Sequence, residues 1–197
     1  MSAPLAKGFA EPVHDAQRAF RAALDALARP GKIMELGRAV EQLELNPAMA
    51  HLLLALADDD SRVWWQPGAA AAAQWLRFHT GAPIAGRPGE AAFAAITDAS
   101  AMPALESFAQ GTPAAPESST TLLVEVSSLD GGPALQWYGP GIRDTKTVRV
   151  GGLPAHFWAQ WQANHAAFPQ GVDLVFTCGA RAIGLPRTTR ISRVEGI

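Results

Sequence analysis

The sequence predicts one α/β domain in which helices flank a mixed β-sheet. Helical and strand patterns alternate through the first half of the chain, and strands joined by short turns dominate the second half, an order typical of layered α/β folds. The chain has 197 residues, of which 48% are apolar and 17% charged, as in globular proteins with a substantial core. We therefore expect residues 1–197 to form a single domain, with residues 1–13 as an N-terminal arm.

The first predicted helix follows Asp15, a suitable N-cap, and Arg29-Pro30-Gly31 ends it. Its apolar residues recur at the i, i+3, i+4 spacing of an amphipathic helix. We expect this stripe, made of Ala16, Ala19, Phe20, Ala23, Leu24 and Leu27, to face the core.

Two further helices are predicted before residue 84. Asn46 followed by Pro47 is a strong helix start, with an Asn cap and proline at the first helical position. Three carboxylates oppose the dipole at a helix C-terminus, so this helix should end before residues 58–60, an aspartate triplet. Pro67-Gly68 opens the next helix, which residues 79–83 end.

The remaining predicted elements are mostly strands. Apolar runs rich in β-branched residues predict them at residues 32–36, 63–65, 91–97, 120–126, 134–138, 145–150, 172–177 and 181–185. Gly131-Gly132 predicts a hairpin turn between the strands at 120–126 and 134–138. Helices at 102–108 and 154–165 and a loop at 110–119 complete the chain.

Composition excludes several classes of protein. The net charge is −2 and no run of lysine and arginine occurs, so neither nucleic acid nor an anionic membrane is an expected partner. The largely apolar run at residues 50–57, which includes His51, is too short to span a bilayer, and no secretory leader is recognisable. We therefore expect a cytoplasmic protein. The six tryptophans predict either a large core or a buried interface with another chain.

No complete catalytic set is visible in the sequence. Phosphate-loop, dinucleotide-binding, zinc-protease and nucleophile-elbow motifs are absent. Lys7, Lys32 and Lys146 are the only lysines, and none lies where a pyridoxal phosphate enzyme would place its Schiff-base lysine. We therefore expect no catalytic residue, no metal site and no cofactor. One cysteine allows no internal disulfide and no cysteine-only cluster.

Three places in the chain could bind an anion. Guanidinium groups, imidazoles, hydroxyls and exposed backbone N–H groups are the usual partners of phosphates. The candidates are Arg77 and His79, then Gly139 and Gly141, then Arg187, Thr188 and Thr189. Each also has a plainer interpretation: a helix C-terminus, a tight turn, and a solvated strand end. For the last group, the residues alone favour the solvated strand end.

Two other features have a chemical interpretation beside a structural one. Cys178 follows an apolar strand, where nucleophiles are often placed, but it needs a base such as His79 or His165; a small core residue is the alternative. The aspartates at residues 58–60 could bind magnesium or simply form a solvated turn. If either site were functional, the chain could be an autonomous small enzyme or binding protein that acts on a phosphorylated metabolite through Cys178 or through an Arg187/His79 anion site.

Several stretches, taken in order, resemble the H subunit of the bacterial phosphonate carbon–phosphorus lyase system, the PhnH family. Each is weak alone, but the ordered set is specific and covers Phe9 to Ile191. Ser61-Arg62 departs from the Thr-Pro pair expected there. The stretches are VHDAQRAFRAALDALARPGKI, LLLALADDDSRVWW, LRFHTGAP, GTPAAPESSTTLLVEV, GPGI and FPQGVDLVFTCGARAIGLPRTT.

This resemblance implies a fold similar to the large domain of pyridoxal-phosphate-dependent transferases, but without the cofactor. It also implies a homodimer that joins G, I and J subunits in a core complex. With the L subunit, the G, H and I subunits are implicated in displacing adenine from ATP by an alkylphosphonate, which gives a ribose 1-alkylphosphonate 5-triphosphate. No catalytic residue is carried over, so the resemblance implies a subunit of a transferase complex that is not catalytic alone.

Overall fold

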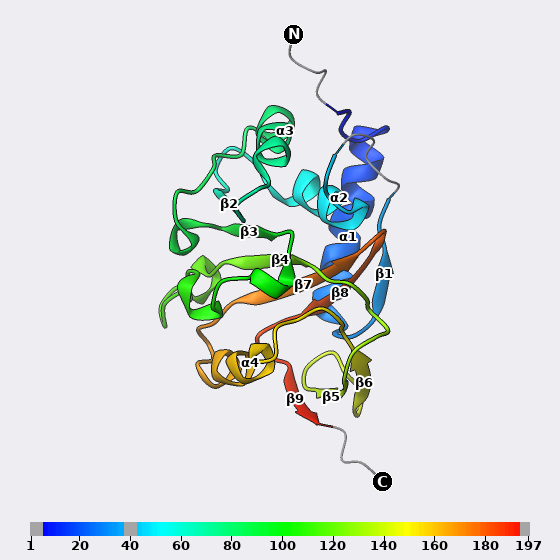
Figure 1. Cartoon of the computed structure of the whole chain (residues 1–197), viewed down its shortest axis with the longest axis vertical. Coiled ribbons are helices and arrows are strands. Elements are labelled where there is room, and N and C mark those ends of the chain that lie inside the picture. Colours follow the sequence, from blue (N-terminus) through cyan, green and yellow to red (C-terminus); the bar gives the residue numbers. More distant parts are fainter. Residues whose placement is uncertain (1–5, 38–42, 194–197) are drawn as a thin grey trace.

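The computed structural model describes residues 6–37 and 43–193, and these form three layers (Figure 1). A six-stranded mixed sheet in the order β1-β8-β7-β4-β3-β2 is the middle layer. Helices α1 (Pro12–Ala28), α2 (Pro47–Leu56) and α3 (Ala70–Thr80) cover one face. Helix α4 (Phe157–Ala166) and a three-stranded sheet, β6-β5-β9, cover the other. The predicted α/β class, a mixed sheet flanked by helices, is confirmed.

The large sheet combines parallel and antiparallel pairs. Strands β2, β3, β4 and β7 are parallel neighbours, and β8 and β1 add antiparallel at one edge. The strands are β1 (Ile33–Glu35), β2 (Val63–Trp65), β3 (Phe93–Ile96), β4 (Thr121–Glu125), β7 (Asp173–Cys178) and β8 (Arg181–Leu185), and the small sheet contains β5 (Ala134–Tyr138), β6 (Lys146–Arg149) and β9 (Arg190–Arg193).

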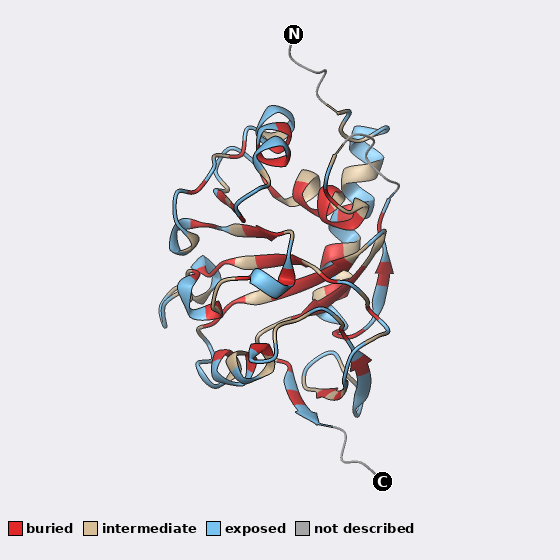
Figure 2. Cartoon of the chain, viewed as in Figure 1, coloured by how far each residue is buried: buried red, intermediate tan, exposed pale blue. Residues whose placement is uncertain are grey.

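Successive side chains of the central strands enter two different cores. Leu122 and Val124 of β4 point toward α4 and the small sheet, whereas Leu123 between them points toward α1, α2 and α3. All three are fully buried, so the strand carries apolar residues without interruption. Figure 2 shows the resulting buried stripe through the middle of the molecule. Trp75 on one side and Trp161 on the other are also fully buried. The large-core interpretation of these two tryptophans is therefore the right one.

The first helix differs from its prediction in two respects. It begins at Pro12, so residues 12 and 13 are helical and the arm is shorter; residues 1–5 lie outside the described part. Asp15 is not the N-cap but lies in the first turn, where its carboxylate accepts from the Glu11 N–H at 2.8 Å. Phe20 and Leu24 are 47% and 54% exposed, because Ala19, Ala23 and Ala26 are the residues that α1 buries.

The predicted hairpin at Gly131-Gly132 is wrong. Strand β4 belongs to the large sheet, whereas β5 pairs with β6 and β9 in the small sheet. The glycine turn therefore carries the chain from one sheet to the other. The predicted helix at 102–108 is reduced to a 3₁₀ turn at Leu105–Ser107, since Pro103 interrupts the segment.

Other local signals are confirmed. Asn46 caps α2, accepting from the Met49 N–H at 2.8 Å, with Pro47 in the first turn. Strands β7 and β8 form an antiparallel hairpin through the turn at Gly179, where φ is +59°. In the described residues, no helix combines the length and apolar character needed to cross a membrane.

Candidate functional site

The Arg187 guanidinium lies inside the protein, with 12% of the side chain exposed. Its Nε donates to the Asp173 carboxylate of β7 at 3.2 Å, and its Nη1 donates to the carbonyls of Pro116 and Pro169 at 3.0 and 3.2 Å. Its Nη2 donates to Asp173 and to the Ser119 hydroxyl. Every guanidinium nitrogen thus has an internal acceptor, and Arg187 holds together three segments that are distant in the sequence.

Backbone contacts bring Thr188, Thr189 and Gly139 together. Thr189 is fully buried; its N–H donates to the Pro186 carbonyl at 2.8 Å, and its carbonyl accepts from Trp161 Nε1 at 3.0 Å. A Cβ on Gly139 would lie 2.9 Å from the Thr188 carbonyl oxygen, where φ at the glycine is +133°. The glycine therefore allows the end of β5 to meet the start of β9. This contact is between main chains, and among the described residues the Thr189 hydroxyl is buried without a hydrogen-bond partner.

Arg77 and His79 lie on the exposed side of α3, near its C-terminus. The His79 ring lies 3.0 Å from the Ala6 carbonyl and packs edge-on to Trp75, so it fixes the N-terminal segment. Helix α3 follows β2, which is four strand spacings from β8 in the sheet order; at about 4.8 Å each this is roughly 19 Å. The structure therefore does not bring Arg187 and His79 into one anion site.

The histidine base that a nucleophilic Cys178 would need is not within reach of it in the described residues. The Cys178 sulfur has one weak contact, 3.7 Å to the Ser127 carbonyl. The His165 ring lies 2.8 Å from the Arg187 carbonyl, and His79 contacts Ala6 instead. Without a base within hydrogen-bond reach, Cys178 lacks what a thiol nucleophile requires.

The aspartate triplet forms the turn after α2. Asp58 accepts from the Ser61 hydroxyl at 2.7 Å and from the Asp60 N–H at 3.2 Å. These hydrogen bonds, that from Ser61 foremost, lower the pKa of Asp58. Within residues 6–37 and 43–193, no three His, Cys, Asp or Glu side chains are grouped so as to hold a metal ion. The solvated-turn interpretation accounts for what the structure shows here.

Glu125 is a titratable group that the sequence analysis overlooked. It ends β4, partly buried, and accepts from the Asn46 N–H at 2.6 Å. Burial raises the pKa of Glu125, and the Asn46 hydrogen bond opposes that shift. Asn46 also donates to the Thr177 hydroxyl at 2.9 Å, so the cap of α2 is joined to β4 and β7. A carboxylate within the apolar run TLLVEV was the available signal.

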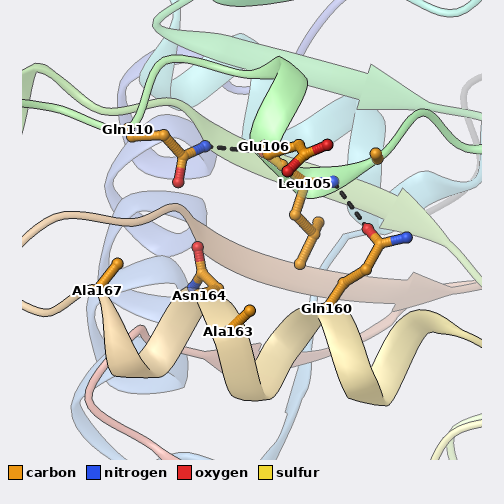
Figure 3. Close-up of a pocket in the computed structure, with 8 residues that line it drawn as sticks. Leu105, Glu106, Gln110, Gln160, Ala163, Asn164 and Ala167 are labelled. Carbon is orange, nitrogen blue, oxygen red and sulfur yellow. Dashed lines mark hydrogen bonds between the residues drawn. The ribbon is translucent and has the colours of Figure 1, made fainter.

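A pocket of about 320 Å³ lies between α4 and the 3₁₀ turn at Leu105–Ser107 (Figure 3). Its amides are engaged in holding the turn: Gln160 accepts from the Leu105 N–H at 2.9 Å, and Gln110 donates to the Leu105 carbonyl at 2.8 Å. Asn164 exchanges two hydrogen bonds with the Val172 backbone. The pocket's only charged lining residue is Glu106. This combination does not suit an anion.

A second pocket, also of about 320 Å³, lies between the end of α1 and the segment joining β5 to β6. Gly141 sits at this contact with φ +82°, and a Cβ there would lie 2.2 Å from the Ala28 carbonyl oxygen. Of the seven predicted anion-site residues, Gly141 alone lines one of these two pockets. The charged residues around it, which the sequence analysis missed, are Arg29, Lys32, Arg143, Asp144 and Lys146.

Comparison with known proteins identifies relatives over almost the entire chain. The family model described as bacterial phosphonate metabolism protein (PhnH) matches residues 7–192. The α-D-ribose 1-methylphosphonate 5-triphosphate synthase subunit PhnH of Rhizobium meliloti (strain 1021) is 42% identical over 188 residues, which cover 94% of each chain. A relative from Stutzerimonas stutzeri, named as the C-P lyase subunit protein HtxG, is 30% identical over 186 residues, covering 89% of this chain and 85% of its own.

Proposed function

This chain belongs to the PhnH family of bacterial phosphonate metabolism proteins, and we propose that it is a subunit of a carbon–phosphorus lyase assembly. The 42% identity to a synthase subunit over 94% of both chains is the observation that carries the proposal. Together with the G, I and L subunits, it serves the displacement of adenine from ATP by an alkylphosphonate. The product is a ribose 1-alkylphosphonate 5-triphosphate.

We propose that the chain is required for this reaction without being catalytic alone. The contacts of Arg187 and His79 support this role, because they tie both side chains to the fold. Cys178 supports the same role, because among the described residues its sulfur contacts the Ser127 carbonyl and not a base that could activate it.

The partners that we propose are the G, I and J subunits and a second copy of this chain, in the cytoplasm. An apolar stripe on α1 supports a partner on that helix. Val13, Phe20 and Leu24 are 66%, 47% and 54% exposed, and at 100° per residue they fall within about 40° of one another around the helix. Exposed apolar groups that gather on one face mark protein–protein contacts. We assign this stripe to another subunit of the assembly.

We also propose that the fold resembles the large domain of pyridoxal-phosphate-dependent transferases without holding the cofactor. The placement of the lysines supports this. Lys7, Lys32 and Lys146 are all exposed, and Lys146 lies on the edge strand of the small sheet. None is positioned to form a Schiff base in a pocket beside the large sheet. Addition of pyridoxal phosphate should therefore produce no stable aldimine absorbance.

The test is reconstitution of adenine release from ATP and methylphosphonate, with G-, I- and L-type subunits, in the presence and absence of this chain. We expect activity only when it is present, and a mass measurement should show it in stoichiometric amount with the G-, I- and J-type subunits. Full activity without the chain, or a chain that stays apart from those subunits, would contradict the proposal.

The α1 stripe has its own test. Phe20→Asp and Leu24→Asp should each weaken assembly at least tenfold, while thermal unfolding of the isolated chain changes little because both side chains are exposed. Phe78→Asp is the matched control, since Phe78 is 68% exposed on a different helix, α3. If the control and the α1 variants weaken assembly equally, the stripe is not the docking surface.

A further inference from the structure

The charged residues around the second pocket indicate that the chain binds a ligand in addition to its partner subunits. Arg29 and Lys32 flank the turn after α1, and Arg143 and Lys146 come from the segment between β5 and β6 and from the start of β6. Asp144 is the one carboxylate in the lining. Four cations against one carboxylate give the pocket a formal charge of +3, in a chain whose net charge is −2. We propose that this basic pocket binds the oligophosphate group of a small molecule.

Close backbone approaches hold the two halves of the basic pocket together. The contact of Gly141 with Ala28 fixes the β5–β6 segment against the end of α1. At Gly31, where φ is +77°, a Cβ would lie 3.2 Å from Lys146 Cδ, so the stem of that lysine crosses the α1–β1 turn. A site built from two rigidly joined segments loses less conformational freedom when it binds a ligand.

The basic groups are also little used by the protein itself. Among the described residues, Lys32, Arg143 and Lys146 form no ion pair, and Arg29 makes one at 3.6 Å with Asp25. Within the described residues, the backbone N–H groups of Arg143 and Asp144 also donate to no backbone acceptor. Uncommitted cations and successive main-chain N–H groups are the partners that phosphate oxygens use. Arg187 differs, because its nitrogens already have internal acceptors.

Size and charge distinguish the class of ligand. A volume of about 320 Å³ is at the lower end for small-molecule sites, so a phosphate chain fits better than a whole dinucleotide. Cations on two opposing segments suit a ligand with several negative charges, one after another, rather than a single phosphonate. The inference rests on this geometry and does not depend on the proposed function.

Inorganic triphosphate is the probe, titrated into the purified full chain by calorimetry at low and at physiological salt. We expect one site per chain, with an affinity that falls as salt rises, because exposed charges are screened. The double variant Lys32→Gln/Arg143→Gln should bind about tenfold more weakly or worse. Arg149→Gln/Arg193→Gln removes the same charge from exposed positions outside the pocket and should change the affinity less than twofold.

Three results would overturn the inference. One is the absence of triphosphate binding, and another is an equal loss in both double variants, which would reflect net charge alone. The third is methylphosphonate binding as tightly as triphosphate, because that would exclude an oligophosphate site. Thermal unfolding of each variant shows whether the fold is intact. If triphosphate fails to bind while the chain still assembles with its partners, only the proposed ligand site is refuted. If triphosphate binds but the chain does not assemble with the G-, I- and J-type subunits, only the proposed function is refuted.

Discussion

Replacing Arg187 by alanine should destabilise the protein severely. The change removes the internal hydrogen bonds of a guanidinium that is 12% exposed, and leaves the Asp173 carboxylate, 21% exposed, without its cation. Breaking a buried ion pair from one side costs about 3–5 kcal/mol. Partial exposure of the aspartate reduces this, so we expect a loss of about 2–4 kcal/mol. Asp173 keeps one donor, the main-chain N–H of residue 187 at 2.7 Å.

Urea unfolding monitored by tryptophan fluorescence measures this loss. In thermal unfolding of a chain of about 200 residues, 1 kcal/mol corresponds to roughly 2–4 °C, so the Tm should fall by about 4–16 °C. Arg187→Lys should recover little, because an ammonium group cannot reproduce the bidentate contact with Asp173. Arg190→Ala is the matched control: it removes the same group from an exposed position three residues away and should cost less than about 0.5 kcal/mol.

Two results would refute this reasoning. One is that Arg187→Ala unfolds with the same stability as Arg190→Ala, and the other is that its loss of stability is unchanged when Asp173→Asn is already present. The double-mutant cycle decides the second point, because a real pair gives a coupling energy of about 0.5–3 kcal/mol. The same result bears on function: loss of growth on a phosphonate in Arg187→Ala would follow from unfolding and would not identify a ligand contact.

Three further predictions concern other residues. Gly141→Ala should cost about 2–4 kcal/mol in urea unfolding, since φ is +82° and the new Cβ meets the Ala28 carbonyl; Gly179→Ala, with φ +59° and no neighbour within 4 Å, should cost about 1 kcal/mol. Burial raises the folded-state pKa of Glu125, so the stability this group contributes is present below about pH 4 and is lost as pH rises through the folded pKa. Glu125→Gln should therefore gain stability relative to the parent between about pH 4 and pH 7, measured by unfolding at each pH. Cys178→Ser should leave growth on a phosphonate unchanged, and loss of growth with an intact fold would restore the thiol as a functional group.

Helices and strands were predicted correctly where residues that are neighbours in the sequence determine the local structure. The Asn46-Pro47 start and the β7–β8 hairpin depend on neighbouring residues, and both form as expected. Tertiary contacts decided the other cases. Phe20 and Leu24 have the spacing of a core stripe, yet α1 approaches the sheet closely through alanines and turns both away from it. The glycine pair at 131–132 has the composition of a hairpin turn but leads to another sheet, which no local pattern reveals.

The candidate site was less predictable, for a related reason. Sequence analysis favoured polar residues that stand together in the chain, and most of these are used to hold the fold. Arg187, which follows a buried strand, reaches acceptors 14 to 71 residues away. The cations of the basic pocket come instead from two separated segments, 29–32 and 143–146. Neither segment carries a motif by itself, and it is the close contacts at Gly31 and Gly141 that bring them together in one site.

The apolar stripe lies on α1, and the basic pocket begins at Arg29, the residue that follows this helix. Leu24 of the apolar stripe and Arg29 of the basic pocket are five residues apart, about 7.5 Å along a helix axis. At 100° per residue the two residues are also about 140° apart around that axis, so a subunit docked on the stripe lies on another side of the helix from the pocket. Coupling between two sites is reciprocal, so the factor by which the partner changes triphosphate binding equals the factor by which triphosphate changes partner binding; here we expect a factor close to one. The isolated chain should therefore bind triphosphate with about the same affinity as the assembled subunit.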